Sequence, residues 1–245
     1  MHSGPSSAQR HDEPVLQFES CGLPLGDGAE EVFSLDLVLR PGELILLQTE
    51  DVLHEEAVSQ ASCGLLEPVS GRVTFRGRDW QAMAPDWSNA SRGRIGIVFR
   101  QDSWVPHLSM MENIILAQLH HTRRPVDEIC LEAARWATRF GLPGLPRDVP
   151  AAVSPADREA ANLVRAFLGA PSLIVVEHLA TQPSAARLQH LVNAMREARE
   201  RGAAILWLTQ DMTLGLNESI PATQRLRLGG TWQDFPAQGA RESAA

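Results

Sequence analysis

Acidic side chains gather in one short stretch of this chain. Glu50, Asp51, Glu55 and Glu56 place four carboxylates within seven residues, and His54 lies among them. Carboxylates interact favourably with the amide groups at the N-terminus of a helix, so one interpretation is a solvated loop that opens a helix. They also repel anions: one like-charge pair at ~5 Å costs about 3 kcal/mol at an effective dielectric constant of ~20. The stretch is therefore a poor place for an anionic ligand.

Further polar side chains follow apolar runs. Residues 173–176 are all aliphatic, as in a buried strand, and Glu177 and His178 come directly after them. Gln210 follows a second apolar run at 203–208, with Thr209 between them. These three side chains are thus predicted at the carboxyl ends of strands.

The elements that position these residues alternate between strands and helices. We expect strands at residues 15–18, 33–39, 44–48, 72–75, 94–99, 173–176 and 203–208. We expect helices at 55–63, from 110 to about 140 with a break near Arg124, from 155 to about 168, and at 184–200. Ser154, Pro155 and Asp157 are typical of a helix start. The order predicts an antiparallel beginning and then a parallel sheet flanked by helices.

Composition excludes several classes of protein. The chain has 245 residues, 44% of them hydrophobic, and a net charge of −8 without a basic run, so a nucleic-acid binder is disfavoured. Three widely spaced cysteines indicate a reduced protein without a disulfide frame or zinc knuckle. The apolar runs are far shorter than the ~20 residues that cross a bilayer, so we expect membrane association only through a partner. We predict one domain at 13–235 between flexible tails at 1–12 and 236–245.

Several segments together resemble the ATP-binding subunit of ABC transporters. FSLDLVLRPGELILL and CGLLEPVSGRVTFRGRDW are similar to the stretches on either side of that family's phosphate loop, and RIGIVFRQDSWVPHLSMMENI is similar to its Q-loop region. ANLVRAFLGAPSLIVVEHLAT and AAILWLTQD are similar to its Walker B and switch strands. The resemblance implies an α/β, ABC-type P-loop NTPase fold: a RecA-like parallel-sheet core, an antiparallel β subdomain and a helical subdomain inserted at about 106–165.

The resemblance places the family's phosphate loop at residues 49–57, where this chain departs from the pattern. In the family, glycine N–H groups and a lysine cradle the phosphates and a hydroxyl binds magnesium. Here the lysine position is Glu55 and the adjacent hydroxyl position is Glu56. The altered loop comprises Thr49, Glu50, Asp51, His54, Glu55, Glu56 and Ala57. We therefore expect no cofactor, with ATP and Mg²⁺ binding weak or absent.

Other motifs of the family depart in the same way. Glu177 stands for the magnesium-ordering Asp, His178 for the water-polarising Glu and Gln210 for the switch histidine, so we expect no catalytic residue. The signature motif aligns with residues 153–157, which keep the serine and lose both glycines at Ser154, Pro155, Ala156 and Asp157. Ser154 is favoured as a helix N-cap over a retained phosphate contact.

Two further hypotheses follow from the resemblance. If the strand ends converge as in the family, His54, Glu55, Glu177 and His178 could hold a divalent ion, although a hydrogen-bonded polar cluster is the favoured interpretation. Arg100, Gln101, Trp104 and Val105 fall where the family docks a helix of the membrane subunit. The alternative for the indole is packing inward between subdomains.

The sequence thus predicts a non-catalytic ABC-type subunit with a structural or regulatory role in a membrane transport complex. Its expected partners are a membrane permease, an ABC ATPase paralogue or both, with no nucleic acid, in a dimer or hetero-oligomer. It is expected in the cytoplasm, peripheral to the inner or plasma membrane. The alternatives are a divergent ATP-binding subunit that works with a partner's help, and a soluble scaffold unrelated to transport.

Overall fold

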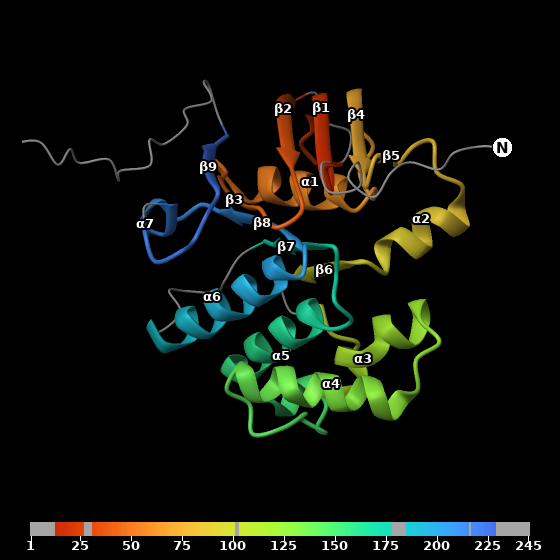
Figure 1. Cartoon of the computed structure of the whole chain (residues 1–245), viewed down its shortest axis with the longest axis vertical. Helices are drawn as coiled ribbons and strands as arrows, with labels where there is room; N and C mark the ends of the chain where they lie inside the picture. Colours follow the sequence, from red (N-terminus) through yellow and green to blue (C-terminus); the bar gives the residue numbers. More distant parts are fainter. Residues whose placement is uncertain (1–12, 27–30, 101–102, 178–184, 216, 229–245) are drawn as a thin grey trace, which may run out of the picture.

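Two β-sheets organise the fold (Figure 1). The structure is a computed structural model, and it describes residues 13–26, 31–100, 103–177, 185–215 and 217–228. The predicted tails at 1–12 and 236–245 lie outside these residues.

The first sheet is antiparallel. Its strand order is β2-β1-β4-β5, made by β1 (Leu16–Pro24), β2 (Val32–Leu39), β4 (Ser70–Phe75) and β5 (Arg78–Asp79). Along β2 the buried residues are Leu35, Leu37 and Leu39, which confirms the alternation expected of a half-buried strand. Arg76 and Gly77 join β4 to β5 with positive φ angles of 51° and 70°, as a tight two-residue hairpin turn requires.

The second sheet is parallel, with the order β6-β7-β8-β3-β9. Its strands are β3 (Leu44–Gln48), β6 (Ile95–Val98), β7 (Leu173–Val176), β8 (Ala204–Thr209) and β9 (Gln224–Arg227). Every residue of β3, β7 and β8 is buried, because apolar groups cover both faces of the sheet. The predicted α/β class and the parallel core are therefore confirmed.

Alternate residues of the central strands enter two different cores. On β7, Leu173 and Val175 pack with α1 and the antiparallel sheet, whereas Ile174 and Val176 pack with the helices of the other face. The second core includes an aromatic group in which the Trp136 and Phe167 ring centroids are 5.3 Å apart. The fold thus has one core on each face of the parallel sheet.

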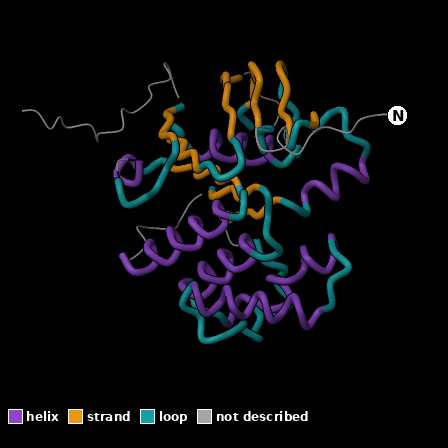
Figure 2. Tube along the Cα trace, in the orientation of Figure 1, coloured by secondary structure: helices purple, strands orange, loops and turns teal. Residues whose placement is uncertain are grey.

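The helices are α1 (Val52–Ser62), α2 (Pro85–Arg92), α3 (Met110–His121), α4 (Val126–Arg139), α5 (Pro155–Phe167), α6 (Ala185–Glu200) and α7 (Met212–Gly215), with a short 3₁₀ turn at Pro150–Ala152. Figure 2 shows α3, α4 and α5 gathered at the end of the molecule opposite the antiparallel sheet. Pro125 separates α3 from α4, as expected near Arg124, because proline lacks the N–H that a continuous helix needs.

Several parts of the fold differ from the sequence-based expectation, and β5, β9 and α7 were not predicted. The helix expected at 55–63 begins three residues earlier, at Val52, because the Asp51 carboxylate caps it by accepting a hydrogen bond from the His54 N–H at 3.0 Å. The helix α2 was not predicted. It is a short, polar helix without a buried residue, so it offers too few apolar positions from which a helix can be read.

Within the described ranges, no helix combines the length and the hydrophobicity that crossing a membrane requires.

Candidate functional site

The carboxyl ends of β6, β7, β8 and β3 meet at one edge of the parallel sheet, because these strands are parallel neighbours. Ligands of open α/β sheets bind outside this edge. Three predicted site residues come together there: Glu55 from the first turn of α1, Glu177 after β7 and Gln210 after β8. Arg100, which was predicted for partner docking, joins them.

A buried ion pair occupies the centre of this edge. The Glu55 side chain is only 2% exposed, and its Oε2 accepts hydrogen bonds from both Nη2 and Nε of Arg100, the latter at 3.1 Å. The Arg100 side chain is 22% exposed. Burial raises the pKa of the Glu55 carboxyl, and Arg100 offsets part of this rise by favouring the charged form. Glu55, which the resemblance predicts at the lysine position of the phosphate loop, is thus a carboxylate neutralised from within the chain.

Glu177 and Gln210 extend this pair into a network. Glu177 Oε2 accepts the backbone N–H of Arg100 at 2.9 Å, and Glu177 Oε1 accepts the Ser59 hydroxyl at 2.7 Å. With its amide oriented to satisfy both neighbours, the Gln210 oxygen accepts from Arg100 Nη2 at 2.6 Å and from the Val52 N–H at 3.2 Å. We call Glu55, Ser59, Arg100, Glu177 and Gln210 the Arg100 cluster. It links α1 to the ends of three strands.

The other acids of residues 49–57 do not share this environment. Asp51 caps α1, and the hydrogen bond from the His54 backbone N–H is the main reason why the pKa of its carboxyl is lowered. Glu50 and Glu56 are exposed, whereas Thr49 and Ala57 are buried. Of the four carboxylates, only Glu55 therefore points into the protein.

The predicted metal ligands are not all brought together. The His54 ring lies 2.8 Å from an Asp51 oxygen through Nδ1 and packs on Phe33 at 4.8 Å between ring centroids. His178 lies outside the described residues. In the described part of the chain, no group of three or more His, Cys, Asp or Glu side chains is arranged to hold a metal ion.

The predicted signature segment forms the start of α5. Ser154 Oγ accepts the Asp157 N–H at 3.1 Å and donates to the Asp157 carboxylate at 2.8 Å, while Pro155 is the first helical residue and Ala156 follows it. This is the N-cap geometry that the sequence favoured for Ser154.

The predicted docking segment is tied to the helices beneath it. Trp104 is half-buried against the core that contains α3 to α5, and the Arg165 guanidinium lies 4.2 Å from its ring centroid. Val105 exchanges hydrogen bonds with the Asn113 side chain, at 2.7 and 3.1 Å. These contacts favour the inward-packing alternative for Trp104. A docking role for this segment stays a prediction, and Gln101 lies outside the described residues.

Sequence reasoning missed two parts of the Arg100 cluster: the pairing of Glu55 with Arg100, and Ser59, which donates to Glu177. Arg100 is 45 residues away from Glu55, and Ser59 was not singled out. One signal was available: Ser59 lies four residues after Glu55 on the same helix, so both face one direction. The pairing with Arg100 left no such signal, because it depends on the tertiary fold.

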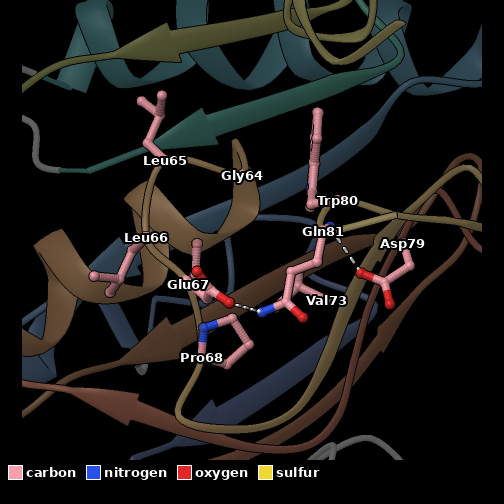
Figure 3. Close-up of a pocket in the computed structure, with 10 residues that line it drawn as sticks. Gly64, Leu65, Leu66, Glu67, Pro68, Val73, Asp79, Trp80 and Gln81 are labelled. Carbon is pink, nitrogen blue, oxygen red and sulfur yellow. Dashed lines mark hydrogen bonds between the residues drawn. The ribbon is translucent and has the colours of Figure 1, made fainter. Parts of the chain in front are cut away.

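Two hollows adjoin α1. The first, of about 340 Å³, borders the Arg100 cluster and is lined by three carboxylates and one guanidinium, from Glu55, Glu56, Glu177 and Arg100. The second, of about 230 Å³, lies beyond the end of α1 and is lined by Gly64, Trp80 and Gln81 among others (Figure 3). Gln81 Nε2 donates to Glu67 Oε1 there at 2.9 Å. The first hollow carries the predicted site residues, and the second carries none of them.

Comparisons with known proteins point in one direction. The family model described as ABC transporter matches residues 58–177. The phosphonates import ATP-binding protein PhnC of Alcaligenes faecalis is 26% identical over 232 residues, covering 91% of this chain and 83% of that protein. The ribose import ATP-binding protein RbsA 2 of Streptomyces avermitilis is 25% identical over 237 residues, covering 94% of this chain but only 45% of its own length. The dimeric cassette MJ0796, in a post-hydrolysis state bound to ADP and Pi, has a TM-score of 0.69 at 17% identity, over 87% of this chain and 94% of that one.

These relatives correct the expectation about cofactors. The prediction that no cofactor is used, with ATP and Mg²⁺ binding weak or absent, is wrong: the relatives are named ATP-binding proteins, and the similar cassette holds ADP and Pi. The prediction failed because it took motif residues alone as the measure of binding. ATP is therefore the cofactor that these similarities imply.

A bound triphosphate needs positive charge and hydrogen-bond donors around its phosphates. A phosphate cradle offers backbone N–H groups and a cation, whereas the hollow beside the Arg100 cluster presents three carboxylates to one guanidinium that is already paired. Glu55 Oε1 is buried without a hydrogen-bond partner among the described residues, and another anion beside it would add repulsion. In this conformation these side chains do not fit a triphosphate, so we derive no chemical step through ATP.

Proposed function

We propose, from the membership of this chain in the ABC transporter family of ATP-binding subunits, that it is a subunit of a membrane transport complex and does not itself catalyse hydrolysis. Its role is structural or regulatory. It holds a place in the assembly, and a competent partner performs the chemistry.

The buried pair of Glu55 with Arg100 carries this proposal. Phosphoryl transfer depends on positive groups that stabilise the charge on the transferred phosphoryl oxygens. In this chain the position of the cation is Glu55, and the nearby Arg100 guanidinium is engaged by Glu55 and Gln210. A guanidinium held by an internal carboxylate is neutralised, so it supplies little stabilisation to a developing anion. Binding and hydrolysis are separate properties, and the proposal concerns hydrolysis.

We propose a permease, an ABC ATPase paralogue or both as partners, at the cytoplasmic side of a membrane. Two observations support this assembly. The relatives are named as import ATP-binding proteins, and the similar cassette MJ0796 forms a dimer. A non-catalytic chain acts through its surfaces, so it requires partners to have a function.

Purification of the tagged chain from detergent-solubilised membranes tests the assembly. We expect a permease or an ATPase to co-purify with the chain, and we expect the purified complex to hydrolyse ATP. A chain that comes down alone, without a membrane protein or an ATPase, would contradict the proposal.

The catalytic part is tested in the same complex with Glu177→Gln. This change removes the charge at the end of β7 but leaves polar atoms toward Ser59 and Arg100. The matched control is Glu200→Gln, at an exposed carboxylate at the end of α6. We expect both variants to retain ATP turnover, measured separately from ATP binding. If only Glu177→Gln abolishes turnover while the complex stays assembled, the chain is instead a divergent hydrolysing subunit.

A further inference from the structure

A third pocket, with a different charge, lies between the β4–β5 hairpin and α2, two elements that are neighbours in Figure 1. Its volume is about 560 Å³. The lining includes the guanidinium groups of Arg76, Arg78 and Arg94, the indole of Trp87 and the carboxylate of Glu13. We call it the arginine pocket. None of its residues belongs to the Arg100 cluster.

The charge of the arginine pocket is opposite to that of the whole chain. Three guanidiniums face one carboxylate, in a protein whose net charge is −8. Several other arginines are paired: Arg72 with Glu19, and Arg124 with Glu132 at 2.7 Å. Among the described residues, no ion pair joins a carboxylate to Arg76, Arg78 or Arg94. These three side chains are thus available to an anion, and the planar guanidinium fork matches phosphate oxygens in pairs.

An exposed indole forms one wall of the arginine pocket. Trp87 is 59% exposed although it is a large apolar side chain, and α2 buries none of its residues. The Arg78 guanidinium lies 4.8 Å from the Trp87 ring centroid. Trp87 therefore has no role in the cores of the protein. A tryptophan beside these guanidinium groups offers a surface for the organic part of an anionic ligand.

The backbone of the hairpin also favours a binding role. Arg76 has a φ of 51°, in the left-handed region where Asn or Gly is the usual residue of such a two-residue turn. An arginine at this position brings conformational strain that asparagine would reduce. Strain that persists at one residue is a reason to look for its function, and the Arg76 side chain lines the arginine pocket.

We propose that the arginine pocket binds a small phosphate ester, with its phosphate among Arg76, Arg78 and Arg94 and its organic part beside Trp87. The volume is within the range of roughly 300–1,000 Å³ that small-molecule sites occupy, and it exceeds the needs of an inorganic ion. The net charge of −8 disfavours a nucleic acid as the source of the phosphate. The site is independent of the proposed transport role.

Calorimetry with four probes tests the proposal: AMP, glucose 6-phosphate, inorganic phosphate and adenosine. We expect at least one phosphate ester to bind more tightly than inorganic phosphate, and adenosine to give no heat. Binding should weaken as sodium chloride is added, because the interaction is between charges. If neither ester binds at millimolar concentration, the proposal is wrong.

Variants then assign the binding to this pocket. Arg78→Gln and Arg94→Gln should each raise the Kd for the bound ester about tenfold or more, because a charge-assisted hydrogen bond is lost. Arg123→Gln, at an exposed arginine outside the arginine pocket, is the matched control and should leave the Kd unchanged. Trp87→Leu should weaken the ester without changing the affinity for inorganic phosphate. All variants are checked for an unchanged melting temperature.

The outcomes separate this site from the Arg100 cluster. Glu177→Gln should leave ester binding intact, because Glu177 does not line the arginine pocket. Binding that survives in the double variant Arg78→Gln/Arg94→Gln, or that falls equally in Arg123→Gln, would overturn the assignment. Neither result would bear on the proposed transport function.

Discussion

Substitution of Arg100 by methionine gives the sharpest test of the buried pair. Methionine keeps the apolar stem of the side chain, and the backbone N–H still donates to Glu177, so only the guanidinium is lost. Glu55, with a side chain 2% exposed, is then left as a buried carboxylate without a counter-ion. Breaking a buried ion pair in this way costs about 3–5 kcal/mol. For a domain of this size that corresponds to a fall in Tm of about 6–20 °C.

Urea unfolding at pH 7 measures this cost, and the double variant Arg100→Met/Glu55→Met provides the control. Because the double variant removes both charges, we expect it to recover most of the lost stability. A loss below about 1 kcal/mol in Arg100→Met, or a double variant as unstable as the sum of its parts, would refute the view that the pair is buried and coupled.

The same variant should respond to acid in a definite direction. The pKa of Glu55 is raised by burial above its ordinary value of 4.5, so the folded state binds a proton more tightly than the unfolded state does. Stability from this group is therefore present below pH 4.5 and is lost as the pH rises through the folded pKa. Without Arg100 this rise is larger. We therefore expect the loss of unfolding free energy in Arg100→Met to become smaller as the pH falls from 7 toward 4.5. The double variant Arg100→Met/Glu55→Gln should not show this pH dependence.

Substitutions at Asp51 and Gly64, and the alkylation of Cys63, have defined outcomes. Asp51→Ala should cost about 1 kcal/mol by urea unfolding, because α1 loses its N-cap. In the wild-type protein, the stabilisation from the Asp51 carboxylate is present above pH 3.8 and is lost as the pH falls through the lowered pKa of the carboxyl. Asp51→Asn should keep most of the capping stabilisation but lose this pH dependence. Gly64→Ala should lower the free energy of unfolding by more than about 1 kcal/mol, because φ at Gly64 is +64° and a Cβ would come within 2.5 Å of the Trp80 ring. A variant as stable as the wild-type protein would contradict this contact between Gly64 and Trp80. Burial raises the pKa of the Cys63 thiol to about 12, so Cys63 should resist alkylation at pH 8 while the half-buried Cys130 reacts, as measured by mass spectrometry.

The parallel core could be predicted from the sequence because its strands have an unambiguous composition. Residues 44–47 and 173–176 are all aliphatic, and a run of this length that is buried on both faces has few alternatives to a central strand. The start of α5 was predicted for a different reason, since Ser154 and Pro155 act locally through their own backbone. Both signals lie in contiguous residues.

The centre of the site could not be predicted in the same way. Glu55 was predicted at the start of a helix, yet its burial and its pairing with Arg100 depend on how α1 approaches the end of β6. An acid at a helix start is ordinarily exposed, as Glu56 is. Only the tertiary structure distinguishes the buried acid from its exposed neighbour.

The tryptophans lie in different layers of the protein, so their intrinsic fluorescence can report on each layer. Trp207 is buried in the parallel sheet, Trp136 among the helices at the far end, and Trp80 beneath the antiparallel sheet, whereas Trp87 stands in solvent. The chain contains no tyrosine, and phenylalanine emits only weakly, so indole dominates its near-ultraviolet emission. The Trp207 Nε1 has no hydrogen-bond partner among the described residues, and an indole in such dry surroundings emits at the blue end of the range. Single-tryptophan variants would therefore report separately on the melting of each layer.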